Sequence, residues 1–209
     1  MDDFPYGAAV KFGWQKTKEN FWNLMAVISI FIVIVGTFNY FTNNFEKTMP
    51  LVSLIVQICS IAINIIMFLG IIRIGLKVYA GEKFNVFEMF NSWGLFFKYF
   101  LGSILYFLSV LVGLCLLIVP GIILAVRMSF WAYLIVDKQL GPLEALKESM
   151  RLTKGSAVNL CLFGFVSLGL LLLGFLALIV GLIVAIPVAQ ISYIFIYRYL
   201  ESKHQPAVA

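Results

Sequence analysis

The sequence predicts an all-α polytopic membrane protein with six transmembrane helices, arranged as three hairpins that each follow a cytoplasmic interfacial helix. Hydrophobic residues are 62% of the 209, and the 16 glycines bring the apolar share to about 70%, against roughly 45–50% in soluble domains. Only 12% of residues are charged, too few to coat a soluble globule of this size. We therefore interpret residues 1–209 as a single membrane domain.

Long charge-free windows supply the transmembrane helices, because about 20 apolar residues are needed to cross about 30 Å of hydrocarbon. The windows 20–45 and 48–72 each hold one span. The window 99–136 is interrupted only by Arg127 and is too long for one helix, and Pro120-Gly121 predicts a tight turn within it. The window 155–197 carries no charge and also fits two spans. The predicted spans are 21–40, 51–72, 99–119, 120–136, 157–175 and 178–197. As an alternative, one of the last two hairpins is re-entrant and enters and leaves the membrane on the same side.

Each outward-going span follows a stretch in which charged and apolar residues alternate with helical spacing. In the last such stretch, Pro142 suits the first turn of a helix and Gly155 suits its end. A helix of this kind is expected to lie in the headgroup plane with its apolar face toward the membrane. The predicted interfacial helices are 6–20, 84–97 and 142–154.

The first and last of these stretches also resemble each other, which predicts an internal repeat. An offset of 136 positions aligns six identical pairs. They are Ala9 with Ala145, Lys11 with Lys147, Thr17 with Thr153, Lys18 with Lys154, Asn23 with Asn159, and Leu24 with Leu160. The middle stretch matches only loosely. We therefore hypothesise three units, each an interfacial helix plus a hairpin, although repeats arise from plain duplication as well as in transporters.

Lysine and arginine predict the orientation, because short loops rich in them stay in the cytoplasm. Thirteen of the 15 basic residues precede span one, follow span six, or lie in the loops between spans two and three and between four and five. Lys47 is the single basic residue on the other side. Both termini are therefore predicted to be cytoplasmic. Aromatic residues near the cytoplasmic ends predict an interfacial belt of Trp22, Trp93, Trp131, Tyr133, Tyr193, Tyr197 and Tyr199.

The sequence offers no catalytic constellation. Its one histidine, His204, lies in the C-terminal tail, which excludes a His-x-x-x-His zinc site and a nucleophile paired with histidine inside a pocket. All ten carboxylates lie at or beyond the membrane edge, so a relay of buried acids is poorly supported. Cys59, Cys115 and Cys161 lie in apolar runs and are interpreted as small buried hydrophobes. We expect no enzyme activity, cofactor, metal or nucleic-acid partner.

One charged residue, Arg127, falls inside a predicted span, near mid-depth. A charge there costs at least about 2.5–3.5 kcal/mol on insertion scales, so a partner or a polar cavity is expected. Gln57 and Asn64 belong to a polar stripe on span two, and Gln190 lies in span six. These four residues form the candidate polar ligand site, in which Arg127 meets an anionic group such as a lipid phosphate. Alternatively, amides and main-chain carbonyls satisfy Arg127 and only hold the helices together.

Three segments carry a family resemblance. The segment 119–127, followed by 133–137 and by 140–155, resembles the small bacterial six-helix membrane proteins related to the membrane domain of glycerophosphoryl diester phosphodiesterases. The resemblance implies the six-helix fold and a bacterial plasma membrane. The chain ends at Ala209, without the soluble catalytic domain of the phosphodiesterase relatives, so their activity is not expected here.

The predicted function is a non-enzymatic membrane module that binds lipid, with anionic lipid as one candidate, or a protein partner on its cytoplasmic face. A small-solute transporter or channel is the alternative, which the repeat and the polar stripe favour. An intramembrane enzyme or accessory subunit ranks third.

Overall fold

A computed structural model describes residues 4–46, 49–176 and 180–204, and within these ranges every regular element is a helix. The short 3-10 helices are labelled η. The elements are α1 (Tyr6–Glu19), α2 (Phe21–Glu46), α3 (Pro50–Ala80), η1 (Val86–Phe90), η2 (Trp93–Leu95), α4 (Phe96–Leu116), α5 (Ile118–Arg127), α6 (Trp131–Lys138), α7 (Pro142–Leu152), α8 (Ala157–Leu176) and α9 (Val180–His204).

Six helical stretches are long and apolar enough to cross a membrane. They are Phe21–Glu46, Pro50–Ala80, Val86–Leu116, Ile118–Lys138, Ala157–Leu176 and Gly181–His204. Large apolar side chains such as Leu116, Val158 and Leu173 are exposed on the outside of the molecule, where water would penalise them and lipid would not. The prediction of six membrane-length helices is confirmed, and the chain is an integral membrane protein.

Helix boundaries differ from the predicted ones for local reasons. α3 continues eight residues past the predicted end at 72, to Ala80, and Gly81 then ends it with a φ of 75°, which glycine adopts without steric cost. The turn expected at Pro120-Gly121 lies instead at Leu117. Pro120 stands in the first turn of α5, where its missing N–H breaks no helical hydrogen bond. Of the turn predicted between the spans 157–175 and 178–197, residues 175 and 176 still belong to α8, and residues 177 and 178 lie outside the described residues.

The predicted interfacial helix 84–97 is wrong. The segment forms η1 and η2, and its last two residues already belong to α4. Asn85 causes the tight first turn, because its side chain accepts a hydrogen bond from the Phe87 N–H while Glu88 accepts one from the Asn85 N–H. This reciprocal cap closes a short turn, and Gly94 further along favours irregular backbone.

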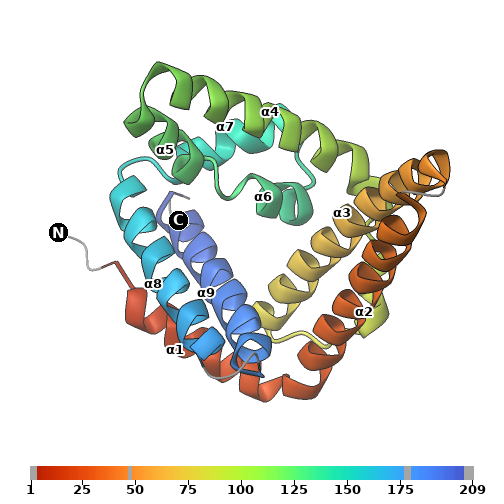
Figure 1. Ribbon diagram of the computed structural model, residues 1–209. Helices are drawn as coiled ribbons and strands as arrows, with labels where there is room; N and C mark the ends of the chain where they lie inside the picture. The colour runs from red at the N-terminus through yellow and green to blue at the C-terminus, as the bar shows by residue number, and fades with distance from the viewer. Residues whose placement is uncertain (1–3, 47–48, 177–179, 205–209) are drawn as a thin grey trace.

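Figure 1 shows three helix pairs, α2 with α3, α4 with α5, and α8 with α9, surrounding a central space. The short helix that precedes each pair packs on a different pair. α1 contacts α9, η1 contacts α3, and α7 contacts α4 and α6. Two glycines permit the close approaches. A side chain at Gly13 would collide with Val188 and Ser192 of α9, and one at Gly70 would collide with the main chain of Met89.

The predicted apolar faces of α1 and α7 are largely covered by protein. Ala9, Gly13 and Thr17 are buried in α1, on the face that meets α9. The predicted aromatic belt holds in part. Trp22 is 82% exposed and Trp93 66%, whereas Trp131 is only 6% exposed and Tyr197 is completely buried. The buried pair belongs to the main hydrophobic core, which α6 and α9 share.

Candidate functional site

The fourth membrane-length stretch is broken in its middle, because α5 ends at Arg127 and α6 begins at Trp131. Two hydroxyls, of Ser149 in α7 and of Thr153 at its C-terminal cap, bond to backbone groups at the break. Ser149 accepts a hydrogen bond from the Phe130 N–H at 3.1 Å and donates to the Arg127 main-chain oxygen at 3.0 Å. Thr153 donates to the same oxygen at 2.8 Å. Irregular backbone inside a membrane protein needs such partners, so α7 holds the break in place.

The Arg127 side chain bonds to the same helix. Its Nη2 donates to the main-chain oxygen of Met150, with 3.0 Å between the two atoms. Met150 lies in the last turn of α7, where unpaired carbonyls and the helix dipole favour a positive charge. The Arg127 Nε is buried and has no hydrogen-bond partner among the described residues. Arg127 therefore stands at a helix end beside a charged helix, instead of in the middle of a continuous span.

The other three predicted site residues lie elsewhere. Asn64 donates to the Ser60 main-chain oxygen one turn earlier in α3, and Gln57 is exposed. Gln190 of α9 donates from Nε2 to the main-chain oxygen of Ile71 in α3, at 2.9 Å. No hydrogen bond between described residues joins Arg127 to these three side chains. The structure therefore supplies a main-chain carbonyl as the partner of Arg127.

Gln190 instead lines an apolar pocket of about 380 Å³ between α2, α3, α6 and α9. Its other lining residues are Ile28, Phe31, Ile32, Phe68, Ile71, Ile72, Tyr133 and Ile186. Gln190 and Tyr133 are the two polar side chains in this wall. We call this cavity the α3–α9 pocket. A largely apolar cavity with a few polar groups is the usual form of a small-molecule site.

Tyr133 connects the α3–α9 pocket to an aromatic cluster in the core. Its ring stacks on Tyr193 at 5.9 Å and on Tyr197 at 6.0 Å between ring centroids. Phe130, at the break between α5 and α6, contacts all three rings. Rigid aromatic packing of this kind fixes the direction of side chains beside it. The orientation of Tyr133 therefore depends on both the break and α9.

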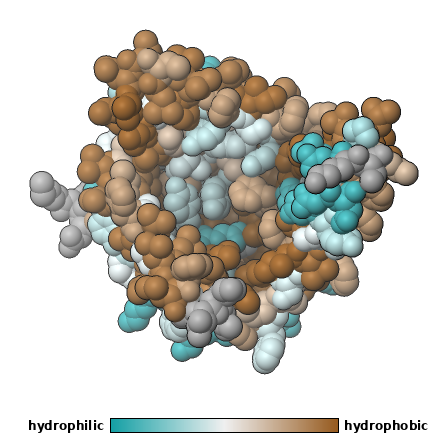
Figure 2. Space-filling view, in the orientation of Figure 1, coloured by the Kyte–Doolittle hydropathy of each residue, from teal (hydrophilic) through white to brown (hydrophobic). Residues whose placement is uncertain are grey.

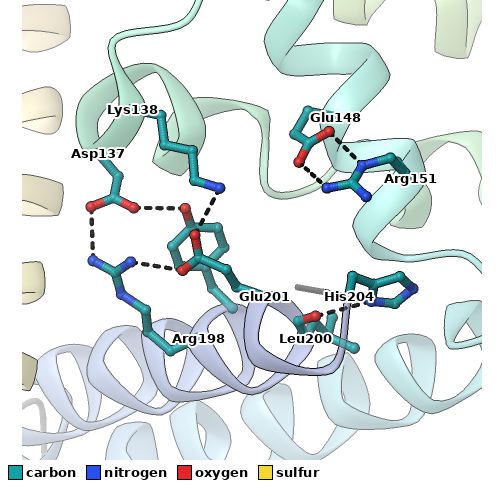
Figure 3. Close-up of polar contacts among 9 residues, drawn as sticks. Asp137, Lys138, Glu148, Arg151, Arg198, Leu200, Glu201 and His204 are labelled. Atoms are coloured by element: carbon teal, nitrogen blue, oxygen red, sulfur yellow. Dashed lines mark hydrogen bonds and ion pairs between the residues drawn. The ribbon is translucent and has the colours of Figure 1, made fainter. Parts of the chain in front are cut away.

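A charged network joins α6 to the end of α9 (Figure 3). Arg198 bridges Asp137 and Glu201, each at 2.7 Å, and Lys138 pairs with Glu201 at 2.7 Å. Tyr197 donates to the second oxygen of Asp137 at 2.8 Å. Sequence reasoning placed these charges outside the spans and missed their pairing. The spacing of four between Tyr133 and Asp137, and between Tyr197 and Glu201, was the available signal for a shared helix face.

Figure 2 shows that the molecule is hollowed at the centre of the three helix pairs, with pale and teal side chains inside and a brown surround. Among the described residues, no group of three or more histidine, cysteine, aspartate or glutamate side chains could hold a metal ion.

Comparison with known proteins gives distant relatives. No family model matches the chain, and no solved structure matches it. Uncharacterised proteins of Mycobacterium bovis and of two strains of Mycobacterium tuberculosis are each 23% identical over 225 residues, which cover 95% of this chain and 69% of theirs. Their names assign no activity, so the resemblance to the membrane domain of glycerophosphoryl diester phosphodiesterases stays a prediction.

Proposed function

We propose that this protein is a non-enzymatic membrane module that binds a membrane lipid in the α3–α9 pocket. The pocket itself carries the proposal. Its volume of about 380 Å³ falls within the range of ligand sites, and seven of its nine lining residues are isoleucine or phenylalanine. Such a wall favours an alkyl or isoprenoid chain, because burial of apolar area supplies the binding free energy.

The two polar residues of the pocket wall, Tyr133 and Gln190, indicate that the ligand also carries a polar group. The Tyr133 hydroxyl can donate or accept a hydrogen bond, and the Gln190 amide can do both at once. A carbonyl or hydroxyl on the ligand, as at the ester linkage of a lipid, suits this pair. Arg127 is not part of the proposed site, because its guanidinium is directed to Met150.

Three repeated units arranged in a ring are proposed as the architecture that builds this pocket. Aligned residues of the first and third units share their environment: Ala9 and Ala145 are fully buried, as are Thr17 and Thr153. Units one and two share a contact as well. Arg73 of α3 donates to the Asn91 main-chain oxygen at the end of η1, as Arg127 donates to Met150 at the end of α7.

The proposed location is a bacterial plasma membrane with both termini in the cytoplasm. Six crossings bring the two ends of the chain to the same side, and the distribution of lysine and arginine favours the cytoplasmic side. The mycobacterial relatives support a bacterial setting.

Native mass spectrometry after extraction in mild detergent tests the proposal. We expect Ile32→Trp, which places a larger side chain in the pocket wall, to retain one lipid fewer than wild-type protein. Leu173→Trp is the matched control, because Leu173 is 67% exposed on the outer surface and does not line the pocket. Tyr133→Phe removes only the hydroxyl group from the pocket wall, so it should weaken lipid retention without abolishing it. Equal retention by Ile32→Trp and Leu173→Trp would refute lipid binding in this pocket.

A transporter or channel is the second candidate function, and two observations favour it. The hollow centre has polar side chains inside it (Figure 2), and broken helices such as α5 and α6 are found at the substrate sites of transporters. Conductance or solute flux across liposomes containing the purified protein would establish this function. Flux that is unchanged in Ile32→Trp would separate it from lipid binding.

A further inference from the structure

A second pocket, of different character, lies where the α1–α2 junction meets the end of α3. Its volume is about 420 Å³. It is lined by Lys16, Glu19, Asn20, Asn23, Val78, Gly81, Glu82, Lys83 and Phe84. Six of these nine residues carry a charge or an amide, in contrast to the α3–α9 pocket. We call it the junction pocket.

The position of the junction pocket matches the level of lipid headgroups. α2 begins at Phe21 and α3 ends at Ala80, so two membrane-length helices have their polar ends at this pocket. Trp22 and Phe87, which flank it in sequence, are 82% and 71% exposed. Exposed aromatic side chains at the ends of spanning helices are typical of the membrane interface.

The junction pocket carries charges of both signs, and their ion pairing lies on the surface. Lys16 pairs with Glu19 at 2.8 Å on the surface, an arrangement that contributes little net free energy and can be exchanged for a ligand. Glu82 and Lys83 are exposed beside Gly81. The last carbonyls of α3 point toward this end of the helix and favour a cation. A ligand with one negative and one positive group therefore meets a partner for each.

We propose that the junction pocket binds the headgroup of a zwitterionic phospholipid that carries a primary amine, of the phosphatidylethanolamine type. Lys16 and Lys83 hold the phosphate, with the Asn23 amide as a further donor. Glu19 and Glu82 accept hydrogen bonds from the ammonium group. A purely anionic headgroup would face two uncompensated carboxylates, and a trimethylammonium headgroup has no N–H to donate.

This site is independent of the α3–α9 pocket. Along α2 and α3, Leu24, Val27 and Ile74 stand between the residues that line the two pockets. All three are buried, with exposed fractions of 6%, 2% and 1%. The failure of either site therefore leaves the other unaffected, and the Ile32→Trp variant should not change headgroup preference.

Native mass spectrometry of the full-length protein reconstituted with matched acyl chains tests the headgroup. The probes are phosphatidylethanolamine, phosphatidylcholine and phosphatidylglycerol vesicles. We expect wild-type protein to retain phosphatidylethanolamine about tenfold more than either other lipid, a ratio within reach of charge-assisted hydrogen bonds. Lys83→Ala should reduce retention of phosphatidylethanolamine, and Glu82→Gln should remove the preference over phosphatidylcholine.

Lys11→Ala is the matched control, because Lys11 is an exposed lysine of α1 outside the pocket. It should behave as wild type. All three substituted positions are exposed, and helicity by circular dichroism checks the fold of each variant. The proposal is overturned if wild-type protein shows no preference for phosphatidylethanolamine, if phosphatidylglycerol binds best, or if Lys83→Ala and Lys11→Ala retain lipid equally.

Discussion

Arg127 and Met150 are joined across two helices by a hydrogen bond from the arginine Nη2 to the main-chain oxygen, at 3.0 Å. The carbonyl group of Arg127 is bonded to α7 as well, through Ser149 and Thr153. Side chain and main chain of one residue thus fix the end of α5 to the end of α7. This contact, and not a ligand cleft, is the structural setting of the one arginine that lies inside a predicted span.

Substitution of Arg127 should destabilise the fold. Arg127→Gln removes a charged hydrogen bond of the kind worth about 1.5–3 kcal/mol, and we expect a lower melting temperature in detergent. Lys147→Gln changes an exposed cation of α7 and should leave the melting temperature unchanged. Lipid retention in the α3–α9 pocket should survive in folded Arg127→Gln, and loss of lipid without loss of stability would contradict a structural role.

The hydroxyls of α7 should be coupled. Ser149→Ala leaves the buried Phe130 N–H without its acceptor, at a cost of about 1–3 kcal/mol. Thr153→Val removes the second donor to the Arg127 oxygen. Since both hydroxyls serve that oxygen, thermal unfolding of the single and double variants should give non-additive losses. Strict additivity would mean that the two hydroxyls act separately.

Gly70 should tolerate no side chain. Gly70→Ala places a methyl group against the Met89 main chain, and overpacking of this kind costs about 1–3 kcal/mol. Gly36 has no atom near its added methyl group, so Gly36→Ala should be neutral or stabilising by up to about 1 kcal/mol. Equal melting temperatures of the two variants would show that η1 can move away from α3.

Loss of Asp137 should loosen α6 from α9. Asp137→Asn removes the partner of Arg198 and weakens the bond from Tyr197. The network is half-buried, so the expected cost lies between the surface and buried limits, about 1–3 kcal/mol. Glu46→Gln, at the exposed end of α2, is the control. A double-mutant cycle with Arg198→Gln should give a favourable coupling free energy.

The Glu148–Arg151 pair predicts a weak acid dependence of stability. Hydrogen bonds from Arg151 hold the pKa of Glu148 below its usual range. The stabilising contribution is therefore complete at pH values above the unfolded pKa of about 4.3 and is lost as the pH falls through the lower folded pKa. Melting temperatures measured from pH 7 to pH 3 should fall less in Glu148→Gln than in wild type.

The sequence predicted the long helices well because the length and charge of an apolar run decide whether it can cross a membrane. Pro120 misled the placement of one turn, since proline suits both a turn and the first turn of a helix. The hydrogen-bond partner of Arg127 could not be predicted, because it is a main-chain carbonyl. Every residue has such a group, so the residue type at position 150 gives no signal. The Asn64 side chain donates its hydrogen bond to a main-chain oxygen within α3. The pattern of polar residues in the sequence does not distinguish such a local bond from a site shared between helices. Gln190 does line a pocket, but with Tyr133.

The packing of α1 on α9 sets an order of assembly for the chain. α1 precedes every other described helix in the chain, yet its buried face is completed mainly by α9, which follows all the others described. Ala9, Gly13 and Thr17 therefore stay uncovered, or are held by another molecule, until α9 has been made. Contacts between such distant segments slow folding. Packing of α1 against α9 is thus a late step in folding. A chain in which α1 does not yet contact α9 is the species most exposed to mispairing or degradation.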